Sequence, residues 1–364
     1  IIMEGKSEKP VYLYIDDETV EIKDAEKYWG MVYYEVTDAL TEAHPGTNVM
    51  CIGPAGEKLS PMAAIMNDVD RAAGRGGVGA VMGYKNVKAV VVKGSKKVEV
   101  ADSELVKKVN ADKVNILKND PVAGGGLPTY GTAVLVNIIN ENGIHPVRNF
   151  QESYTEKADL ISGEAMTENC LVKKNPCYRC PIACGSWVKL NDGREVGGPE
   201  YETLWSFGSD CDIYDLDAIN RANELCNEYG LDTISAGATI AAAMELYQRG
   251  YIKDEELVAD GLSLNWGDVE SMVAWTKKMG LREGFGDKLA EGSYRLCESY
   301  NATQYSMTVK KQELPAYDPR GVKGHGITYA VNNRGGCHIK GYMINPEILG
   351  VPEKLDRLAL EGKP

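Results

Sequence analysis

The sequence predicts an α+β protein in which a β-rich N-terminal domain is followed by mainly α-helical domains. Apolar and polar side chains alternate with the two-residue period of strands in residues 11–15 and 20–23, and residues 87–94 form a third apolar run. From about Ser103 onward the apolar residues recur with the period of helices. The 364 residues exceed the size, about 250–300 residues, at which one hydrophobic core stops growing, so we expect two or three domains.

Each predicted element follows from one of these two periods. In the first hundred residues we expect helices at 33–42 and 62–73, between the strands. Residues 313–321 contain closely spaced Pro and Gly and are predicted to form a loop. In the second part of the chain the helical period predicts helices at residues 104–119, 132–142, 216–229, 233–249, 269–281 and 286–300.

Charge and composition limit the classes of partner. The chain has 40 Lys and Arg against 53 Asp and Glu, a net charge of −13, so it lacks the basic surface that nucleic acids and anionic membranes require. We find no apolar run of about 18 residues or more and no N-terminal signal peptide, and we therefore expect a soluble, cytoplasmic protein that binds small molecules or other proteins. Both ends fall within predicted elements, which suggests a fragment.

Three of the nine cysteines lie close together in the sequence. Cys177, Cys180 and Cys184 have the spacing Cys-x2-Cys-x3-Cys, with prolines next to the first two. Such a short loop brings several thiolates onto one iron–sulfur cluster, and a cluster in turn favours a reducing compartment. Zinc ligation and unrelated core cysteines are the alternatives. The fourth ligand is left open among Cys170, Cys211, Cys226, Cys337 and residues beyond Pro364.

A second motif is rich in glycine. Gly74, Gly76 and Gly79 match the dinucleotide-binding pattern G-x-G-x-x-G, but a predicted helix precedes them and only a short segment follows. That pattern requires a strand before the glycines and a long helix after them. A glycine-rich turn without a ligand is one alternative. Another is an anion-binding loop in which Arg71 and Arg75 contact phosphate.

Two further groups of polar residues are candidates for a binding site. Asn227 and Asp232 flank Gly230, which suits the left-handed end of one helix, while Asp232 suits the start of the next. Helix capping alone explains this spacing, and the functional alternative is that both side chains bind the N–H edge of a heterocycle. Glu202 and His338 together form the minimal set for moving protons near neutral pH, although each taken singly is more often structural.

Together these motifs resemble the tungsten- or molybdenum-containing aldehyde:ferredoxin oxidoreductase family. Besides the three cysteines, the resemblance rests on residues 71–83 (RAAGRGGVGAVMG), 230–235 (GLDTIS) and 314–321 (LPAYDPRG), in this order, and it extends through the whole chain. It implies an oxidoreductase that uses water to oxidise an aldehyde to the carboxylic acid. Electrons would pass from a tungsten or molybdenum centre through a [4Fe–4S] cluster to ferredoxin.

The resemblance also implies a domain organisation. Residues 1–98 match the C-terminal part of a β-rich pterin-binding domain, and residues 99–307 match a mainly helical domain that carries the cluster-binding loop. Residues 308–364 match the truncated start of a third, mainly helical domain. The family's fourth cluster cysteine then lies beyond Pro364, so we expect the fragment alone to be inactive.

Site residues follow from the same resemblance. The implied cofactor is a bis-pterin, either tungstopterin or molybdopterin, whose phosphates are bridged by Mg²⁺. Glu202 would act as a base, and His338 would hydrogen-bond the aldehyde oxygen or shuttle its proton. By position, the matching residues are Arg71 and Ala72 for the phosphates and Mg²⁺, Asn227, Asp232 and Lys340 for the pterins, Cys177, Cys180 and Cys184 for the cluster, and Glu202 and His338 nearest the metal.

Two departures from the family pattern limit the transfer. The family's first pterin-binding aspartate is Asn227 here, which implies weaker or differently oriented pterin binding. The positions that hold a bridging iron in dimeric archaeal members are Arg221 and Val273 here, so we expect no bridging iron and leave homodimer formation open. The rival functions are the same family acting on formaldehyde or glyceraldehyde-3-phosphate, a zinc-stabilised binding module without redox chemistry, and an NAD-linked dehydrogenase.

Overall fold

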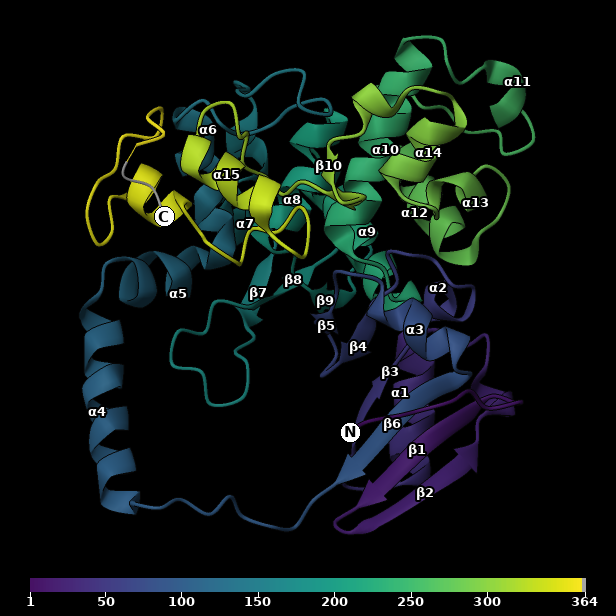
Figure 1. The fold of residues 1–364 in the computed structure, drawn as a ribbon, viewed down its shortest axis with the longest axis vertical. Coiled ribbons are helices and arrows are strands. Elements are labelled where there is room, and N and C mark those ends of the chain that lie inside the picture. The colour runs from purple at the N-terminus through teal and green to yellow at the C-terminus, as the bar shows by residue number, and fades with distance from the viewer. Residues whose placement is uncertain (362–364) are drawn as a thin grey trace.

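A six-stranded mixed sheet forms the N-terminal part of the chain in a computed structural model that describes residues 1–361 (Figure 1). The strand order is β2-β1-β6-β3-β4-β5, and the one parallel pair is β1 with β6. The central strand β6 contains four valines among its seven residues and is buried over most of its length, as a central strand requires. The strands are β1 (Val11–Asp16), β2 (Thr19–Asp24), β3 (Asn48–Cys51), β4 (Ile65–Asn67), β5 (Arg71–Ala73) and β6 (Val87–Lys93).

Three helices accompany this sheet: α1 (Tyr33–Ala43), α2 (Pro54–Glu57) and α3 (Val78–Tyr84). Helix α1 covers one face, because its buried Tyr33, Val36 and Leu40 belong to the same apolar cluster as Tyr12 of β1 and Val49 of β3. The predicted strands at 11–15, 20–23 and 87–94 and the predicted helix at 33–42 are therefore confirmed.

The helix predicted over residues 62–73 is wrong, since strands β4 and β5 form there instead. Its first residues pair with the helical domain: Ala64 N–H donates to the Gly230 carbonyl at 2.8 Å, and Asp232 N–H donates to the Met62 carbonyl at 2.9 Å. Ala63 and Leu231 form an isolated antiparallel bridge between these two contacts. Pairing with a distant segment thus overrides the local apolar period.

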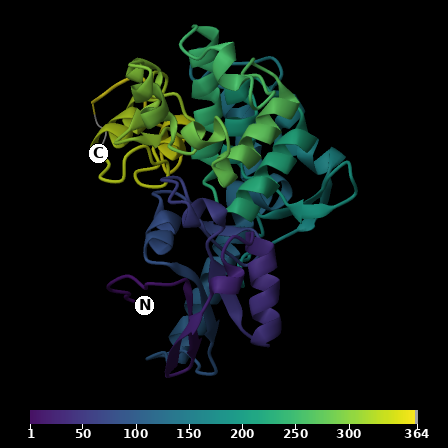
Figure 2. The same cartoon turned by 90° about the vertical axis from the view of Figure 1, so that its right-hand side faces the viewer.

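The rest of the chain is mainly helical, and apart from α4 it lies together at the end of the sheet domain, as both views show (Figures 1 and 2). Small sheets interrupt it: β7 (Leu171–Lys174), β8 (Ser186–Lys189) and β9 (Glu195–Gly197) form one, and β10 (Thr308–Val309) and β11 (Gln312–Glu313) form another. The α+β class is confirmed. The helices are α4 (Ser103–Asn119), α5 (Leu127–Tyr130), α6 (Leu135–Glu141), α7 (Gly163–Asn169), α8 (Tyr201–Phe207), α9 (Leu216–Tyr229), α10 (Thr233–Gln248), α11 (Asp254–Leu257), α12 (Val269–Leu281), α13 (Gly286–Leu289), α14 (Ser293–Ser299) and α15 (Lys323–Val331).

Most of the helices predicted in this part are present, with two differences. The helix predicted at 286–300 is divided into α13 and α14, because Gly292 between them adopts a φ of 86°. The helix predicted at 132–142 starts only at Leu135, after a short 3₁₀ turn. The domain limits at 98 and 307 remain predictions.

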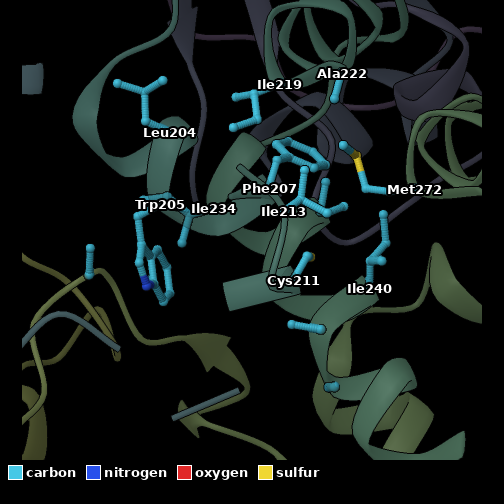
Figure 3. Close-up of a cluster of buried hydrophobic side chains, with 14 of the residues drawn as sticks. Leu204, Trp205, Phe207, Cys211, Ile213, Ile219, Ala222, Ile234, Ile240 and Met272 are labelled. Atoms are coloured by element: carbon cyan, nitrogen blue, oxygen red, sulfur yellow. The ribbon is translucent and has the colours of Figure 1, made fainter. Parts of the chain in front are cut away.

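The main core lies between α8, α9, α10 and α12, where large apolar side chains of all four helices meet (Figure 3). Trp205 and Phe207 of α8 are fully buried in it, and the Trp205 indole N–H donates to the Pro146 carbonyl at 2.8 Å. Helices α8 and α10 approach closely at Gly237, since a Cβ there would lie 2.6 Å from the Ser206 carbonyl carbon. This core fixes the position of α8, which begins beside the candidate site.

One helical run, Val122–Glu141, is long and apolar enough to cross a membrane by length and composition, with a mean hydropathy of 1.3. The core helix of a soluble protein passes the same test, so one such run is weak evidence. The expectation that the chain has no membrane partner remains a prediction.

A buried ion pair inside the sheet domain generates a stability prediction. The Lys88 side chain is fully buried, contacts Glu57 and donates to the Met31 carbonyl at 2.9 Å, while Glu57 accepts the Gly30 N–H at 2.8 Å. Glu57→Gln leaves the ammonium without its counter-charge in a dry environment. We expect the free energy of unfolding to fall by about 3–5 kcal/mol, measured by chemical denaturation.

The matched control is the solvent-exposed pair of Glu104 and Lys107, whose side chains are 80% and 73% exposed. Glu104→Gln should leave the denaturation midpoint unchanged, because exposed pairs contribute little. If Glu57→Gln and Glu104→Gln have equal effects, the buried pair does not stabilise the domain.

Candidate functional site

The three clustered cysteines lie on the loop between β7 and β8. Cys177 is exposed and Cys180 and Cys184 are half-buried, and the Cys180 N–H donates to the Cys177 carbonyl at 2.9 Å. Burial raises the pKa of the Cys184 thiol, with further contributions from the negative charges of Glu200 and of the other two cysteines. Within residues 1–361 the side chains of Cys, His, Asp and Glu form no group of three or more arranged to hold a metal ion. The cluster therefore remains a prediction.

The cysteine loop is attached to the sheet domain next to Arg71. The Arg71 guanidinium donates to the Asn175 carbonyl at 2.5 Å, and the Asn175 amide donates to the Asp70 carboxylate at 2.8 Å. Arg71 and Cys177 also line one groove of about 870 Å³ between the loop and strands β3 and β6. The position predicted to hold phosphates is thus brought to the predicted cluster loop.

Arg75, four residues further on, links three distant segments. Its guanidinium donates to the Asp232 carboxylate at 3.1 Å, to the Gly336 carbonyl at 2.6 Å and to the Glu313 carbonyl at 2.7 Å. The Arg75 and Asp232 side chains are only 8% and 7% exposed. Each of the three Arg75 nitrogens therefore makes one protein contact, and the alternative in which Arg75 contacts phosphate remains a prediction.

The junction between α9 and α10 has the predicted capping geometry. Gly230 has a φ of 72° at the end of α9, and Asp232 accepts the Ser235 N–H at 3.3 Å and its hydroxyl at 2.7 Å. The capping contacts and Arg75 all use Oδ2 of Asp232, which leaves Oδ1 available to a ligand. The Asn227 side chain is mostly buried and makes no hydrogen bond to any residue in the range 1–361. Capping and ligand binding are thus compatible here.

Glu202, near the start of α8, is buried beside this junction. Its Oε2 accepts the Ala316 N–H at 2.9 Å, while Oε1 is buried without a partner among the described residues. Burial raises the pKa of Glu202 to about 8, although the Ala316 N–H and the Arg75 charge act in the opposite direction. A carboxyl group with this pKa exchanges its proton near neutral pH.

His338 lies in the loop after α15, next to the ring of Tyr317, with 6.5 Å between ring centroids. Its Nδ1 is buried and has no partner in residues 1–361. Burial and the positive charge of Arg75 lower the pKa of His338 to about 4, so the imidazole is neutral at physiological pH. Because Arg75 influences the pKa of both His338 and Glu202, the two groups lie around the same buried cation.

The remaining predicted residues lie on the surface or in the core. Lys340 is exposed and has no partner among the described residues. Arg221 forms an ion pair with Glu270 at 3.4 Å, whereas Val273 is buried; the absence of a bridging iron remains a prediction. Of the cysteines considered as a fourth ligand, Cys211, Cys226 and Cys337 are buried and Cys170 is half-buried.

The residues fit the cofactors that the sequence implies. Orphaned polar atoms mark where a polar ligand is expected, because a buried polar group without a partner is costly. Glu202 Oε1 and His338 Nδ1 are two such atoms. The free oxygen of Asp232 and the Arg71 guanidinium in the open groove add groups suited to a pterin and its phosphates. Ala72, in β5, lies between the two arginines.

Several residues of the site could not be identified from the sequence alone. The contacts of Arg75 join positions 157 and 261 residues away, and no local pattern indicates them. Tyr201 and Tyr317 are also missed: their ring centroids lie 5.7 Å apart, and the negative charge of Glu202 raises the pKa of each in addition to burial. The available signals were the position of Tyr201 directly before Glu202 and that of Tyr317 within the motif at 314–321.

Comparison with known families identifies the chain. Residues 108–364 match the family model described as aldehyde ferredoxin oxidoreductase, domains 2 and 3, and residues 1–94 match the model of the N-terminal domain of the same family. The chain therefore belongs to the aldehyde ferredoxin oxidoreductase family.

Similar proteins extend this finding. The chain is 59% identical to the tungsten-containing aldehyde ferredoxin oxidoreductase of Pyrococcus furiosus and 57% identical to that of Thermococcus kodakarensis, in each case over 98% of this chain and 59% of the relative. It thus spans 59% of the length of these relatives. It is also similar to a solved structure, the active site complex BamBC of benzoyl coenzyme A reductase with 1,5-dienoyl-CoA, with 27% identity and a TM-score of 0.75 over 91% of this chain and 52% of that one.

The contacts of Arg75 lead to a prediction on stability. Arg75→Met removes three buried hydrogen bonds and leaves the Asp232 carboxylate without its counter-charge. We expect the free energy of unfolding to fall by about 3–5 kcal/mol, measured by urea denaturation. Arg75→Lys should recover only part of the lost free energy of unfolding, because an ammonium cannot make the same forked set of hydrogen bonds. The exposed Arg295 provides the control, and equal effects of Arg75→Met and Arg295→Met would contradict the proposed linkage.

The raised pKa of Glu202 predicts a pH dependence of stability. Between about pH 4.5, its ordinary pKa, and about pH 8 the folded chain retains a proton that the unfolded chain has released. The free energy of unfolding therefore falls as pH rises through this window, by about 1.4 kcal/mol per pH unit from this group. Glu202→Gln should remove that part of the slope in denaturation curves measured from pH 4 to 9. Parallel pH profiles for the two proteins would show that Glu202 is ionised when folded.

Proposed function

We propose that this sequence forms part of an enzyme that oxidises aldehydes to carboxylic acids and passes the electrons through a [4Fe–4S] cluster to ferredoxin. The overall change is RCHO + H₂O → RCOOH + 2e⁻ + 2H⁺. A tungstopterin is the favoured cofactor, because the similar proteins from Pyrococcus and Thermococcus are named as tungsten-containing. Formaldehyde and glyceraldehyde-3-phosphate are alternative substrates within the same proposal.

One observation carries the proposal. The short segment from Arg71 to Arg75 contacts the cysteine loop at one end, through Asn175, and the Asp232 carboxylate at the other. The cysteine loop and the α9–α10 junction, which are separate in the sequence, thereby lie on either side of the segment from Arg71 to Arg75. This arrangement supports a single redox site in which electrons travel a short distance from the substrate to the cluster.

The bis-pterin metal centre, when bound, supplies the two-electron acceptor that no side chain can provide. Asp232 Oδ1 and Asn227 would bind the N–H edge of one pterin, Lys340 would contact a pterin, and Arg71 with the Ala72 carbonyl would hold the phosphates and their Mg²⁺. Cys177, Cys180 and Cys184 would ligate the cluster.

Glu202 and His338 handle the protons in this proposal. Glu202 is fixed by the Ala316 N–H at Oε2, and in its ionised form, the minor species at neutral pH, its free Oε1 can take a proton from water as the oxygen attacks the aldehyde carbon. His338 is neutral, and its N–H can donate a hydrogen bond to the aldehyde oxygen without introducing a charge into the buried site. Both groups lie close to the Arg75 charge, which helps to stabilise the ionised form of Glu202.

The test uses a full-length enzyme that carries this sequence. Metal analysis should find tungsten and iron, and an aldehyde should reduce ferredoxin. Glu202→Gln should lower the turnover number at least about 100-fold, the loss expected when a general base is removed. Glu224→Gln is the matched control, because burial also raises the pKa of Glu224, to about 7, but its carboxylate is bonded to Tyr34 on α1.

Two outcomes would contradict the proposal at different levels. Unchanged turnover in Glu202→Gln, with tungsten and iron still bound, would show that the assigned base is wrong. Thiolate–iron charge transfer gives an absorption band at about 400 nm. If metal analysis finds zinc in place of iron and this band is absent, the zinc-stabilised binding module is favoured and redox chemistry is rejected.

A further inference from the structure

His325, on α15, is a buried histidine that the proposed function leaves without a role. Its ring is fully buried, and neither Nδ1 nor Nε2 has a hydrogen-bond partner among residues 1–361. Leaving a buried polar atom unpaired is costly, because the atom loses the hydrogen bonds that it makes to water when the chain is unfolded. By contrast, His145, which is also fully buried, has a partner for Nε2, the Ser209 hydroxyl at 2.5 Å. The ring nitrogens of His325 therefore require hydrogen-bond partners other than the side chains of the described residues.

The surroundings of His325 place it next to the candidate catalytic residues. Its ring packs edge-on against Tyr317, Tyr329 and Tyr342, with centroid distances of 5.2, 4.6 and 6.1 Å. Tyr317 is in turn a neighbour of His338, and the charge of His338, after burial, contributes to lowering the pKa of His325 to about 3. The two imidazoles thus share one aromatic chamber.

The position of the imidazole is held by the backbone of α15. The Glu347 carboxylate accepts the N–H groups of Gly324 and His325 at 2.9 and 3.1 Å, which fixes the first turn of the helix. The ring is therefore placed independently of any bond from its own nitrogens. Such a fixed, uncharged ring presents one N–H donor on one nitrogen and one lone-pair acceptor on the other.

The two unpaired nitrogens have opposite hydrogen-bonding character, and this identifies the partner. An aldehyde oxygen only accepts hydrogen bonds, so it can satisfy the N–H but not the bare nitrogen. Water both donates and accepts, and it can satisfy either nitrogen. On the basis of the proposed function, which consumes one water and releases two protons for each aldehyde, we propose that His325 binds water on both ring nitrogens and relays protons between the site of Glu202 and the exterior by exchanging tautomers.

The relay balances without a charged intermediate. The bare nitrogen takes a proton from the water on the reaction side, which regains one from protonated Glu202, while the N–H on the opposite nitrogen gives its proton to the second water, which passes one of its own on toward the exterior. The imidazole stays neutral, as its burial among three tyrosine rings requires. The route outward would pass the hydroxyls of Tyr317 and Tyr342, which are 3.0 Å apart; Tyr317 is buried and Tyr342 is half-buried.

The first test measures water directly. The chain has four histidines, so ¹⁵N labelling of histidine alone gives four imidazoles that can be assigned by substitution. The signals that disappear in His325→Gln belong to the His325 ring. In the unmodified protein these signals should show a neutral ring from pH 5 to 9, with a nuclear Overhauser effect between its N–H and bound water. A ring that is charged at pH 7, or that has no contact with water, would overturn the proposal.

The second test measures turnover in a full-length enzyme. His325→Gln keeps a donor and an acceptor but cannot exchange tautomers, so kcat should fall at least about tenfold with KM unchanged, and the solvent deuterium isotope effect on kcat should increase. The control is His44→Gln in the sheet domain, where His44 is hydrogen-bonded to Tyr12 at 2.9 Å; it should leave kcat and the isotope effect unchanged.

If His325→Gln has the same kcat and the same isotope effect as the unmodified enzyme, the proposed proton relay is wrong. Failure of the unmodified enzyme to oxidise aldehydes would reject the proposed function instead, while the labelling experiment would still decide whether His325 holds water.

Discussion

The ion pair between Arg75 and Asp232 is the interaction on which the geometry of the candidate site depends. A buried guanidinium needs acceptors for its donors, and the three nitrogens of Arg75 find them on the α9–α10 junction, on β11 and on the loop after α15. Three parts of the chain are therefore held in one arrangement by a single side chain. Because the backbone of residues 62–64 pairs with the same junction, the sheet domain and the helical domain meet at one fixed position.

Local chemistry made part of this site predictable from the sequence. The left-handed Gly230 and the capping role of Asp232 depend on residues within one turn, and both are confirmed. The helix expected over 62–73 failed for the opposite reason, since its backbone pairs with residues about 170 positions away along the chain. The role of Arg75 was not predicted for the same reason. Neighbouring residues indicate a local conformation, but they do not indicate which distant segment a side chain will contact.

The titratable groups of the site share one electrostatic environment. Glu202 is shifted toward its protonated form, and His325 and His338 toward their neutral forms, in each case mainly by burial. The Arg75 cation opposes this shift for Glu202 and reinforces it for His338. Because a proton that moves between two neutral groups leaves an ion pair, which is costly in a dry interior, this environment favours transfers in which each group gains and loses a proton together.

The scaffold that holds the site does not by itself specify the substrate. The chain is 33% identical to the aliphatic sulfonate oxidoreductase WOR-like subunit of Pyrococcus furiosus over 93% of this chain and 58% of that protein, whose name refers to a different substrate. One fold thus serves several reactions, and the discrimination has to come from side chains that face the reactants. Here those candidates are Tyr201, Tyr317, His325 and Tyr342, which project from α8, α15 and the loops around them. In the proposed function, Arg75 and Asp232 fix where these side chains lie, and the aromatic chamber would then select which aldehyde approaches Glu202 and His338.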